Sequence, residues 1–479
     1  MSVPPSAIMT DLYQLTMMQG YLETGLSDDE ACFDLFFRSN PFGGGYTLFA
    51  GLEEALNFLE AMRFSAEDME YLDSLGIFNK AFLDFLAGFK FTGDVHSPDE
   101  GCVVFPLEPV LRVTAPLYQC QLVETALLNI INFQTLIATK SARICQEAGH
   151  DNVIEFGLRR AQGVDGGLTA SRAAYVGGCS GTSNMLAGKK YGIPVRGTHA
   201  HSWVTAFDSE LEAFQKFAAI FPDNCILLVD TYDTLKSGVP NAIKTGLEMK
   251  GRGHKLLGIR LDSGDLAFLS IEARKALDAA GLHDTKIVAS NELDENIIHD
   301  LKAQGAKIDI FGVGTRLVTG FGEPAITGVY KMSALRKKGG EWVNKLKLSE
   351  WAAKSSLPGV KQVWRMKEAD GTMMADLIEM DGEKPDFSQG VWGHHPILDY
   401  QKKFYDNVAG AEPMLKPVMT GGKAAKHRPA LKEIREHARQ SLSALHHTTK
   451  RLLNPHRYKV SLGQNLNDIT MKMREEGKE

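Results

Sequence analysis

Residues 194–203 read PVRGTHAHSW, and this stretch shows the pattern on which the central part of the chain is built. A short apolar run breaks at Gly197 into a polar turn that carries His199 and His201, and apolar residues resume at helical spacing from Trp203. We therefore expect a strand, a tight loop and a helix, with His201 at or near the helix N-terminus. An imidazole there can act as a nucleophile or a base, although a histidine in such a loop often only caps a helix.

Further apolar runs repeat this alternation between residues 150 and 325. Each ends in glycine or a polar residue and is followed by a helical stretch; the runs are 153–157, 174–177, 225–230, 256–262, 286–290 and 308–312. Strands that alternate with helices indicate a parallel sheet with crossover helices. So many units in so even a series favour a (β/α) barrel, complete or incomplete, over a doubly wound sheet.

The segments on either side of this region have a different pattern. Residues 1–148 combine several helices with short strands near 91–118, and residues from about 326 to 420 read as lysine-rich strands and turns. We expect 1–148 and about 326–420 to form one mixed α+β domain beside the barrel domain at 149–325. Residues 421–479 contain more lysine and arginine than aspartate and glutamate, which predicts a basic helical C-terminal extension with a solvated face.

Composition limits the class of protein. A hydrophobic content of 44% and a charged content of 23% are typical of a globular chain, and a net charge of -6 gives no reason to expect nucleic acid as a partner. The six cysteines are scattered without a CxxC pair, so neither a disulfide framework nor a zinc site is indicated. No apolar window is long enough to span a membrane, and the first residues lack signal-peptide features. We expect a cytoplasmic protein.

Polar or aromatic side chains follow most of the predicted strands. In a barrel the carboxyl ends of the strands share one mouth, so these side chains are expected to converge there. The glycine-rich turn at 312–315 offers backbone N–H groups and a hydroxyl that suit a phosphate. The residues that we assign to the mouth are Phe156, Arg159, Ser183, Thr198, His199, His201, Asp230, Arg260, Asp262, Ser290, Gly312, Gly314 and Thr315.

These residue types suggest distinct chemical tasks. Arg260 and Asp262 can hold an anion and the hydroxyls of a sugar, and Phe156 can stack on a planar ring. Asp230 can orient the imidazole of His201 and stabilise its charged form. Acidic residues beside phosphates suit Mg²⁺, but no spacing of histidines and acids resembles a dedicated metal site, so the metal ligands stay unassigned. The residues alone indicate an enzyme that binds a phosphorylated sugar and a planar anion.

Long motifs over roughly residues 8–365 resemble the nicotinate phosphoribosyltransferases, a family of type II phosphoribosyltransferases in NAD salvage. The motifs follow one another in the family's order: TDLYQ at 10–14, LFFR at 35–38, PFGG at 41–44, GLRRAQG at 157–163, DGGLTAS at 165–171, GTHAHS at 197–202, RLDSGD at 260–265 and GVYK at 328–331. The chain beyond about residue 400 resembles the family only loosely.

The resemblance implies a reaction and a mechanism. The 5-phosphoribosyl group of 5-phosphoribosyl 1-pyrophosphate is transferred to nicotinate, which gives nicotinate mononucleotide and pyrophosphate, and ATP hydrolysis is coupled to the transfer, with Mg²⁺ as the expected metal. In this family the histidine at the position of His201 is transiently phosphorylated by ATP, and Asp230 matches the acid that supports it. His199 stands where relatives usually carry an apolar residue, so we expect it to be a bystander in the chemistry.

The resemblance also assigns substrate contacts. Those to nicotinate fall on Tyr13, Phe156, Thr198 and Arg260, and those to phosphate fall on Arg159, Gly314 and Thr315. To these we add Ser183 for nicotinate and Arg38, Asp262 and Gly312 for the phosphoribosyl or pyrophosphate groups. In the family Tyr13 reaches the site from the other subunit, which implies a homodimer.

The position of Ser183 bears on the choice of base. The related nicotinamide enzyme has an aspartate there, and a hydroxyl can donate to the nicotinate carboxylate where an aspartate would repel it. Two alternatives stay open: a nicotinamide phosphoribosyltransferase, and a TIM-barrel enzyme that binds another sugar phosphate.

Overall fold

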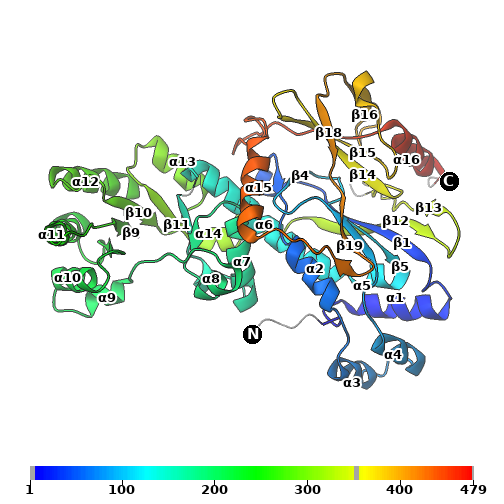
Figure 1. The fold of residues 1–479 in the computed structure, drawn as a ribbon, viewed down its shortest axis with the longest axis horizontal. Coiled ribbons are helices and arrows are strands. Elements are labelled where there is room, and N and C mark those ends of the chain that lie inside the picture. Colours follow the sequence, from blue (N-terminus) through cyan, green and yellow to red (C-terminus); the bar gives the residue numbers. More distant parts are fainter. Residues whose placement is uncertain (1–5, 151, 350–354, 477–479) are drawn as a thin grey trace. The chain divides into compact units, whose positions relative to one another are not determined.

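The computed structural model describes residues 6–150, 152–349 and 355–476, and the chain divides into two compact units (Figure 1). The central unit is Lys140–Pro324, and the flanking unit combines Met1–Thr139 with Ala325–Glu479. Helix α6, Glu124–Ala148, carries the chain from the flanking unit into the central one. Within the described residues, no helix combines the length and the hydrophobicity needed to cross a membrane.

The central unit is built on a six-stranded parallel sheet with the order β7-β6-β11-β10-β9-β8. The strands are short, as expected for buried apolar runs that end in glycine or polar residues. Their bounds are β6 Val153–Glu155, β7 Gly181–Thr182, β8 Ile226–Leu228, β9 Gly258–Leu261, β10 Lys286–Ser290 and β11 Ile310–Val313. The last strand of the series, β11, pairs with the first, β6, so the strands follow a cyclic order that is open between β7 and β8.

The predicted barrel is therefore not confirmed, because the described residues form an open sheet rather than a closed one. The apolar run at 194–197 makes only an isolated parallel bridge, between Val195 and Thr182. Pro194 has no N–H group to donate, and Gly197 ends the extended run after two more residues, so the segment is too short and too poor in donors to pair on both sides.

Helices connect these strands, and one of them corrects a predicted strand. The run 174–177 belongs to the end of α7, Val164–Val176, because a buried apolar run has the same appearance in a helix and in a strand. The strand at this point of the chain is β7, a few residues later. The other helices of the central unit are α8 Met185–Tyr191, α9 His201–Thr205, α10 Glu210–Ile220, α11 Val239–Gly251, α12 Leu266–Ala279, α13 Glu295–Ala303 and α14 Thr315–Val318, with the shorter turns η2 Leu158–Arg160 and η3 Thr234–Gly238.

The flanking unit mixes strands from both ends of the chain. One sheet has the order β13-β12-β1-β5-β3-β19-β20, a second has the order β17-β16-β21-β15-β14-β18, and β2 pairs with β4. The antiparallel pairs β1·β12 and β3·β19 each join an N-terminal strand to a C-terminal one. The strands are β1 Glu30–Phe37, β2 Thr47–Leu48, β3 Asp94–Ser97, β4 Val103–Val104, β5 Leu111–Pro116, β12 Gly328–Arg336, β13 Trp342–Asn344, β14 Lys361–Lys367, β15 Met373–Met380, β16 Val391–His394, β17 Lys402–Tyr405, β18 Gly410–Pro413, β19 Lys416–Thr420, β20 Lys423–Ala424 and β21 Val460–Leu462.

Helices pack on these sheets around a large apolar core. The core takes residues from both chain segments, from Leu15 in α1 to Leu466 in α16. In α1 the buried residues are Gln14, Leu15 and Met18, whereas another face of the helix stays exposed. The helices are α1 Leu12–Glu23, α2 Leu52–Ala61, α3 Ala66–Ser74, α4 Lys80–Ala87, α5 Leu117–Leu122, α15 Leu431–Ser443 and α16 Gln464–Glu476, with the short turns η1 Pro41–Gly43 and η5 Phe387–Gln389.

The segment that we expected as a separate basic extension, 421–479, is part of the flanking unit. Its strand β21 pairs in parallel with β15, and Leu462 and Leu466 are buried in the core. In α15 a few residues, among them Ile434 and Ala438, are buried while the charged residues face solvent. Charge alone did not reveal the buried stripe of α15, because the charged residues lie on the opposite face of the helix.

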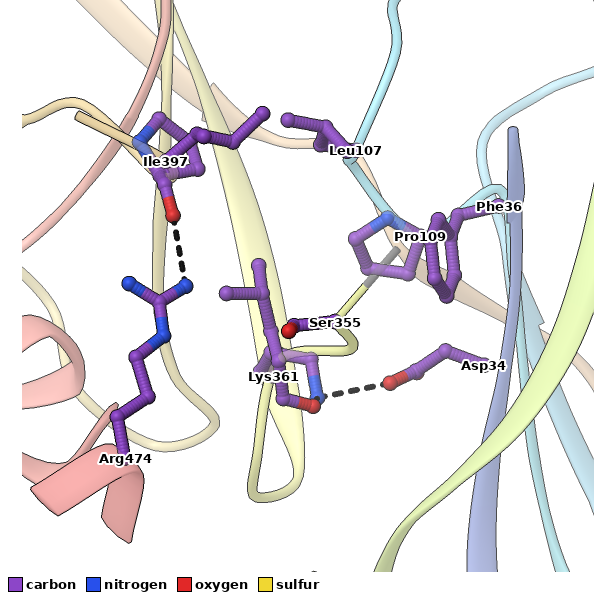
Figure 2. A pocket seen from close by; sticks show the side chains of 10 residues that line it. Asp34, Phe36, Leu107, Pro109, Ser355, Lys361, Ile397 and Arg474 are labelled. Atoms are coloured by element: carbon purple, nitrogen blue, oxygen red, sulfur yellow. Dashed lines mark hydrogen bonds and ion pairs between the residues drawn. The ribbon is translucent and has the colours of Figure 1, made fainter. Parts of the chain in front are cut away.

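A small cavity in the flanking unit is lined by charged and apolar residues, among them Asp34, Phe36, Lys361 and Arg474 (Figure 2). Its volume of about 20 Å³ is room for about one water molecule and far too little for a nucleotide. The buried Lys361 ammonium donates to Asp34 Oδ2 at 2.7 Å and to three backbone carbonyls between 357 and 359. The cavity therefore lies over a buried structural ion pair, and none of the predicted site residues lines it.

We expect Lys361→Met to lower the free energy of unfolding by about 3–5 kcal/mol, because the buried Asp34 carboxylate loses its counter-charge. The measurement is urea unfolding followed by circular dichroism. The control is Lys416→Met, which breaks an exposed pair with Asp99 and should change stability by about 0.5 kcal/mol or less. An equal decrease in the free energy of unfolding in the two variants would contradict a special role for the buried pair of Lys361 and Asp34.

Candidate active site

Arg260, in β9, lies at the centre of the cluster of predicted residues in the central unit. Its guanidinium donates from Nε to Ser290 Oγ at 2.9 Å, from Nη1 to Thr198 Oγ1 at 3.1 Å and from Nη2 to Asp262 Oδ1 at 2.9 Å. The guanidinium carbon lies 5.6 Å from the centre of the Phe156 ring. Only 12% of the Arg260 side chain is exposed, so its charge acts largely out of water.

Asp262 is the counter-charge of Arg260. Burial by itself raises the pKa of this carboxyl, but the hydrogen bond from the Ser290 hydroxyl and the nearby Arg260 charge outweigh burial, and the pKa lies below its usual value. Asp262 is therefore ionised at neutral pH. Its second oxygen, Oδ2, lies 3.7 Å from His201 Nε2, which links the arginine cluster to the imidazole.

His201 is the first residue of α9, as predicted, and 43% of its side chain is exposed. Its Nδ1 lies 3.1 Å from the Thr231 hydroxyl, and its Nε2 faces Asp262. The imidazole is thus held on one side and open to solvent, which is the arrangement that a nucleophile needs. The short helix begins at this histidine because Ala200 is still extended.

Asp230 does not orient His201, contrary to our prediction. Its Oδ2 accepts from the Asp262 N–H at 2.8 Å and from the Ser263 hydroxyl at 2.7 Å, so the carboxylate holds the turn after β9. The pairing of β8 with β9 places Asp230 beside that turn. Thr231, which the sequence analysis did not single out, holds the imidazole instead; its place directly after Asp230 at a strand end was the available signal.

The Asp230 carboxylate also has one free oxygen. Its Oδ1 is buried and has no hydrogen-bond partner among the described residues. No group of three or more histidine, cysteine, aspartate or glutamate residues in the described part of the chain is arranged to hold a metal ion by itself. One carboxylate oxygen beside bound phosphates nevertheless fits the way Mg²⁺ is usually held, by one or two carboxylates and substrate oxygens.

His199 is buried rather than free in its loop. Its Nε2 accepts a hydrogen bond from the Leu228 N–H of β8 at 3.2 Å, and its Nδ1 lies 3.2 Å from the Ala200 carbonyl. The ring meets Phe217 of α10 edge-on at 4.8 Å. Burial is the main reason that the pKa of His199 is lowered. The two histidines of the segment therefore have different environments.

The glycines at the end of β11 leave room for Phe156. A Cβ atom on Gly312 would lie 2.6 Å from the Phe156 ring, and one on Gly314 would lie 3.1 Å from the Phe156 carbonyl. The Phe156 N–H donates to the Val313 carbonyl, which holds the ring beside this turn. Thr315 follows as the first residue of α14. The turn at 312–315 and the aromatic ring therefore form one surface.

Ser183 is placed by a buried carboxylate that the sequence analysis missed. Its side chain is exposed, and its N–H donates to the Glu155 carbonyl at 2.9 Å. The Glu155 side chain accepts from the Ser171 hydroxyl at 2.8 Å, from the Thr182 hydroxyl at 2.5 Å and from the Gly157 N–H. These bonds join β6, β7 and α7, and they hold the loop that carries Ser183.

The remaining predicted residues are Arg159, Tyr13 and Arg38. Arg159 is exposed on η2, shortly after Phe156. Tyr13 and Arg38 belong to the flanking unit: Tyr13 is 48% exposed on α1, and Arg38 follows β1 with a buried Nε atom that has no partner among the described residues.

Comparisons with known proteins cover nearly the whole chain. Three family models match: the nicotinate phosphoribosyltransferase N-terminal domain at residues 8–132, the nicotinate phosphoribosyltransferase family at 152–356 and its C-terminal domain at 360–470. The chain is 43% identical over 460 residues to nicotinate phosphoribosyltransferase of Bacillus subtilis, covering 96% of this chain and 93% of the relative. It is 35% identical over 517 residues to the human protein of that name, covering 96% and 95%.

Solved structures agree with these relatives. The crystal structure of human nicotinic acid phosphoribosyltransferase matches with a TM-score of 0.86 at 33% identity, over 97% of this chain and 99% of that one. Nicotinate-nucleotide pyrophosphorylase from Pyrococcus furiosus matches with a TM-score of 0.69 at 24% identity, over 91% and 95%, and this second likeness concerns the fold alone.

Proposed function

The chain belongs to the nicotinate phosphoribosyltransferase family, enzymes of the phosphoribosyltransferase type, and we propose that ATP hydrolysis through a phosphohistidine drives its reaction. In this reaction the 5-phosphoribosyl group passes from 5-phosphoribosyl 1-pyrophosphate to the ring nitrogen of nicotinate, and pyrophosphate leaves. The observation that carries the proposal is the cluster in which Arg260 joins Thr198, Asp262 and the Phe156 ring, with Asp262 Oδ2 3.7 Å from His201 Nε2.

Nicotinate binds at Arg260 in this proposal. The planar pyridine stacks on Phe156, and its carboxylate meets the guanidinium and the hydroxyls of Thr198 and Ser183. The low exposure of Arg260 supports this assignment, since an ion pair with little water around it discriminates strongly between a charged and a neutral base. Stacking also orients the ring nitrogen toward the sugar, which lowers the barrier by positioning.

The phosphoribosyl group extends from there across the turn at 312–315. Gly312, Gly314 and Thr315 offer backbone N–H groups and a hydroxyl to the 5-phosphate, and Asp262 accepts from the ribose hydroxyls. Arg159, exposed on η2, neutralises phosphate charge. Asp230 would help to hold Mg²⁺, which when bound stabilises the leaving pyrophosphate.

His201 attacks the γ-phosphorus of ATP in the coupled step. The bond from its ring nitrogen to phosphorus forms as the bond to the bridging oxygen breaks, ADP leaves, and water later releases phosphate from the histidine. Thr231 holds Nδ1, so Nε2 is the nitrogen left free to react. The ionised Asp262, 3.7 Å from Nε2, favours the positive charge that builds on the ring.

We place the functional unit in a homodimer. On α1 the exposed residues Leu12, Tyr13 and Met17 form an apolar surface that the flanking unit itself does not cover. A second copy of the chain is a partner that can cover this surface, and Tyr13 would then reach the nicotinate of the neighbouring subunit. The site is complete only with both copies.

An assay with and without ATP tests the proposal. The purified protein is incubated with nicotinate, 5-phosphoribosyl 1-pyrophosphate and Mg²⁺, and mononucleotide formation is followed. Product that ATP stimulates supports the coupled reaction. Product from nicotinamide but not from nicotinate would mean that Ser183 is misinterpreted, and no product from either base would leave another sugar-phosphate reaction as the better hypothesis.

The choice of base depends on charge at Ser183. We expect Ser183→Asp to raise the ratio of kcat/KM for nicotinamide to that for nicotinate by about tenfold or more, because a carboxylate repels nicotinate and accepts from the amide. The matched control is Ser183→Asn, which has the same size without the charge and should shift the ratio far less. If Ser183→Asp left the ratio of kcat/KM for nicotinamide to that for nicotinate unchanged, charge at this position would not determine the choice of base.

A further inference from the structure

The open side of the central sheet is spanned by the segment 195–199. At its start the segment is fixed to β7: the Thr182 N–H donates to the Pro194 carbonyl at 3.0 Å, and the Arg196 N–H donates to the Thr182 carbonyl at 2.9 Å. Among the described residues, the N–H groups of residues 197–200 make no hydrogen bond. The far end of the segment must therefore be held by side chains.

His199 is the buried anchor at that far end. The Val229 N–H pairs with β9, so the preceding N–H, that of Leu228, points to the open edge of β8. Leu228 is buried, and His199 Nε2 accepts its N–H at 3.2 Å. A buried N–H without an acceptor is costly, so the imidazole takes the place of a missing neighbouring strand.

The contacts of His199 define its tautomer. Since Nε2 accepts from a backbone N–H, it carries no proton, and the proton is on Nδ1, which donates to the Ala200 carbonyl at 3.2 Å. The ring is only 8% exposed and is packed against Phe217. Both nitrogens are engaged, so this neutral histidine does not take part in the chemistry itself.

We propose that His199 is a positioning residue. It closes the open side of the sheet and thereby holds Thr198 and His201 in place. Thr198, on one side, accepts from Arg260, and His201, two residues on, contacts Thr231. Loss of the hydrogen bond between His199 and the Leu228 N–H would therefore displace both Thr198 and His201. The inference rests on the proposed function, because it assigns nicotinate binding to Thr198 and phosphorylation to His201.

Two variants distinguish the role of the hydrogen-bond acceptor Nε2 of His199 from the role of the volume of its side chain. His199→Leu keeps apolar volume but removes the acceptor, whereas His199→Gln can present an oxygen at the position of Nε2. We expect His199→Leu to raise the KM for nicotinate and to slow phosphorylation of His201 by ATP, each by about tenfold, and His199→Gln to stay within about threefold of the unsubstituted enzyme.

Amide hydrogen exchange at Leu228 gives a readout that does not depend on activity. We expect faster exchange at Leu228 in His199→Leu and unchanged exchange in His199→Gln. Unchanged exchange and KM in His199→Leu, or a His199→Gln variant that behaves like His199→Leu, would overturn the proposal. If the unsubstituted enzyme forms no product, the proposed function fails, but the exchange data still decide whether His199 closes the sheet. Should His199→Leu fail to fold, the expected near-normal behaviour of His199→Gln remains the test.

Discussion

Replacing Arg260 with glutamine is expected to lower kcat/KM for nicotinate by about a hundredfold or more. The guanidinium joins Thr198, Asp262 and Ser290, and glutamine can keep at most part of these contacts and none of the charge. Truncating one partner of a largely buried charge pair costs about 2–5 kcal/mol, and here the Asp262 carboxylate is left to repel the substrate. The loss should appear mainly in the KM for nicotinate, because the charge acts on the bound carboxylate before the transition state.

Two controls sharpen this test. Arg260→Lys keeps the positive charge but loses the planar guanidinium. Its kcat/KM for nicotinate should therefore lie between that of the unsubstituted enzyme and that of Arg260→Gln. Arg252→Gln changes an exposed arginine of the same unit and should leave the kinetics as they are. Steady-state kinetics with both pyridine bases give the comparison. An equal loss for nicotinate and nicotinamide in Arg260→Gln would mean that the arginine supports the fold or the sugar, not the carboxylate.

His201→Asn is expected to abolish the effect of ATP on the reaction. Without the ring nitrogen that faces Asp262, no phosphoryl group can be accepted, so the rate with ATP should fall to the rate without it. The variant leaves the N-cap residue Ala200 unchanged, so the short helix α9 should still form. The second measurement is incorporation of phosphate from γ-labelled ATP into the protein, which should fall to background.

The control for this variant is His254→Asn. His254 lies in the same unit, is partly exposed and contacts Asp223, so its loss should leave both ATP stimulation and labelling intact. Labelling that persists in His201→Asn would place the phosphoryl group on another residue. Labelling that disappears while ATP stimulation persists would mean that phosphorylation is not the step that couples ATP to transfer.

The candidate site could be predicted from the sequence only as a set of residues. Arg260, Asp262, His201 and Thr198 each stand where an apolar run ends, and a parallel sheet brings such ends to one edge. This reasoning holds whether the sheet is closed or open, so the set does not depend on a closed barrel. Which residue contacts which depends on side-chain geometry, and the pairing of His201 with Thr231 in place of Asp230 was not predictable from the order of residues.

The sequence by itself determined five strands of the central unit (β6 and β8 to β11), the family and the residues that are candidates for chemistry, because short apolar runs and long motifs are local features of the chain. Only the tertiary structure decided that the run 174–177 is helical, that β21 joins a sheet of the flanking unit and that the segment 195–199 spans an open edge. It also decided the place of His199, which the sequence alone suggested was a bystander. Each of these depends on which backbone groups of distant segments meet, and hydrogen bonding between distant segments leaves no periodic signal in the sequence.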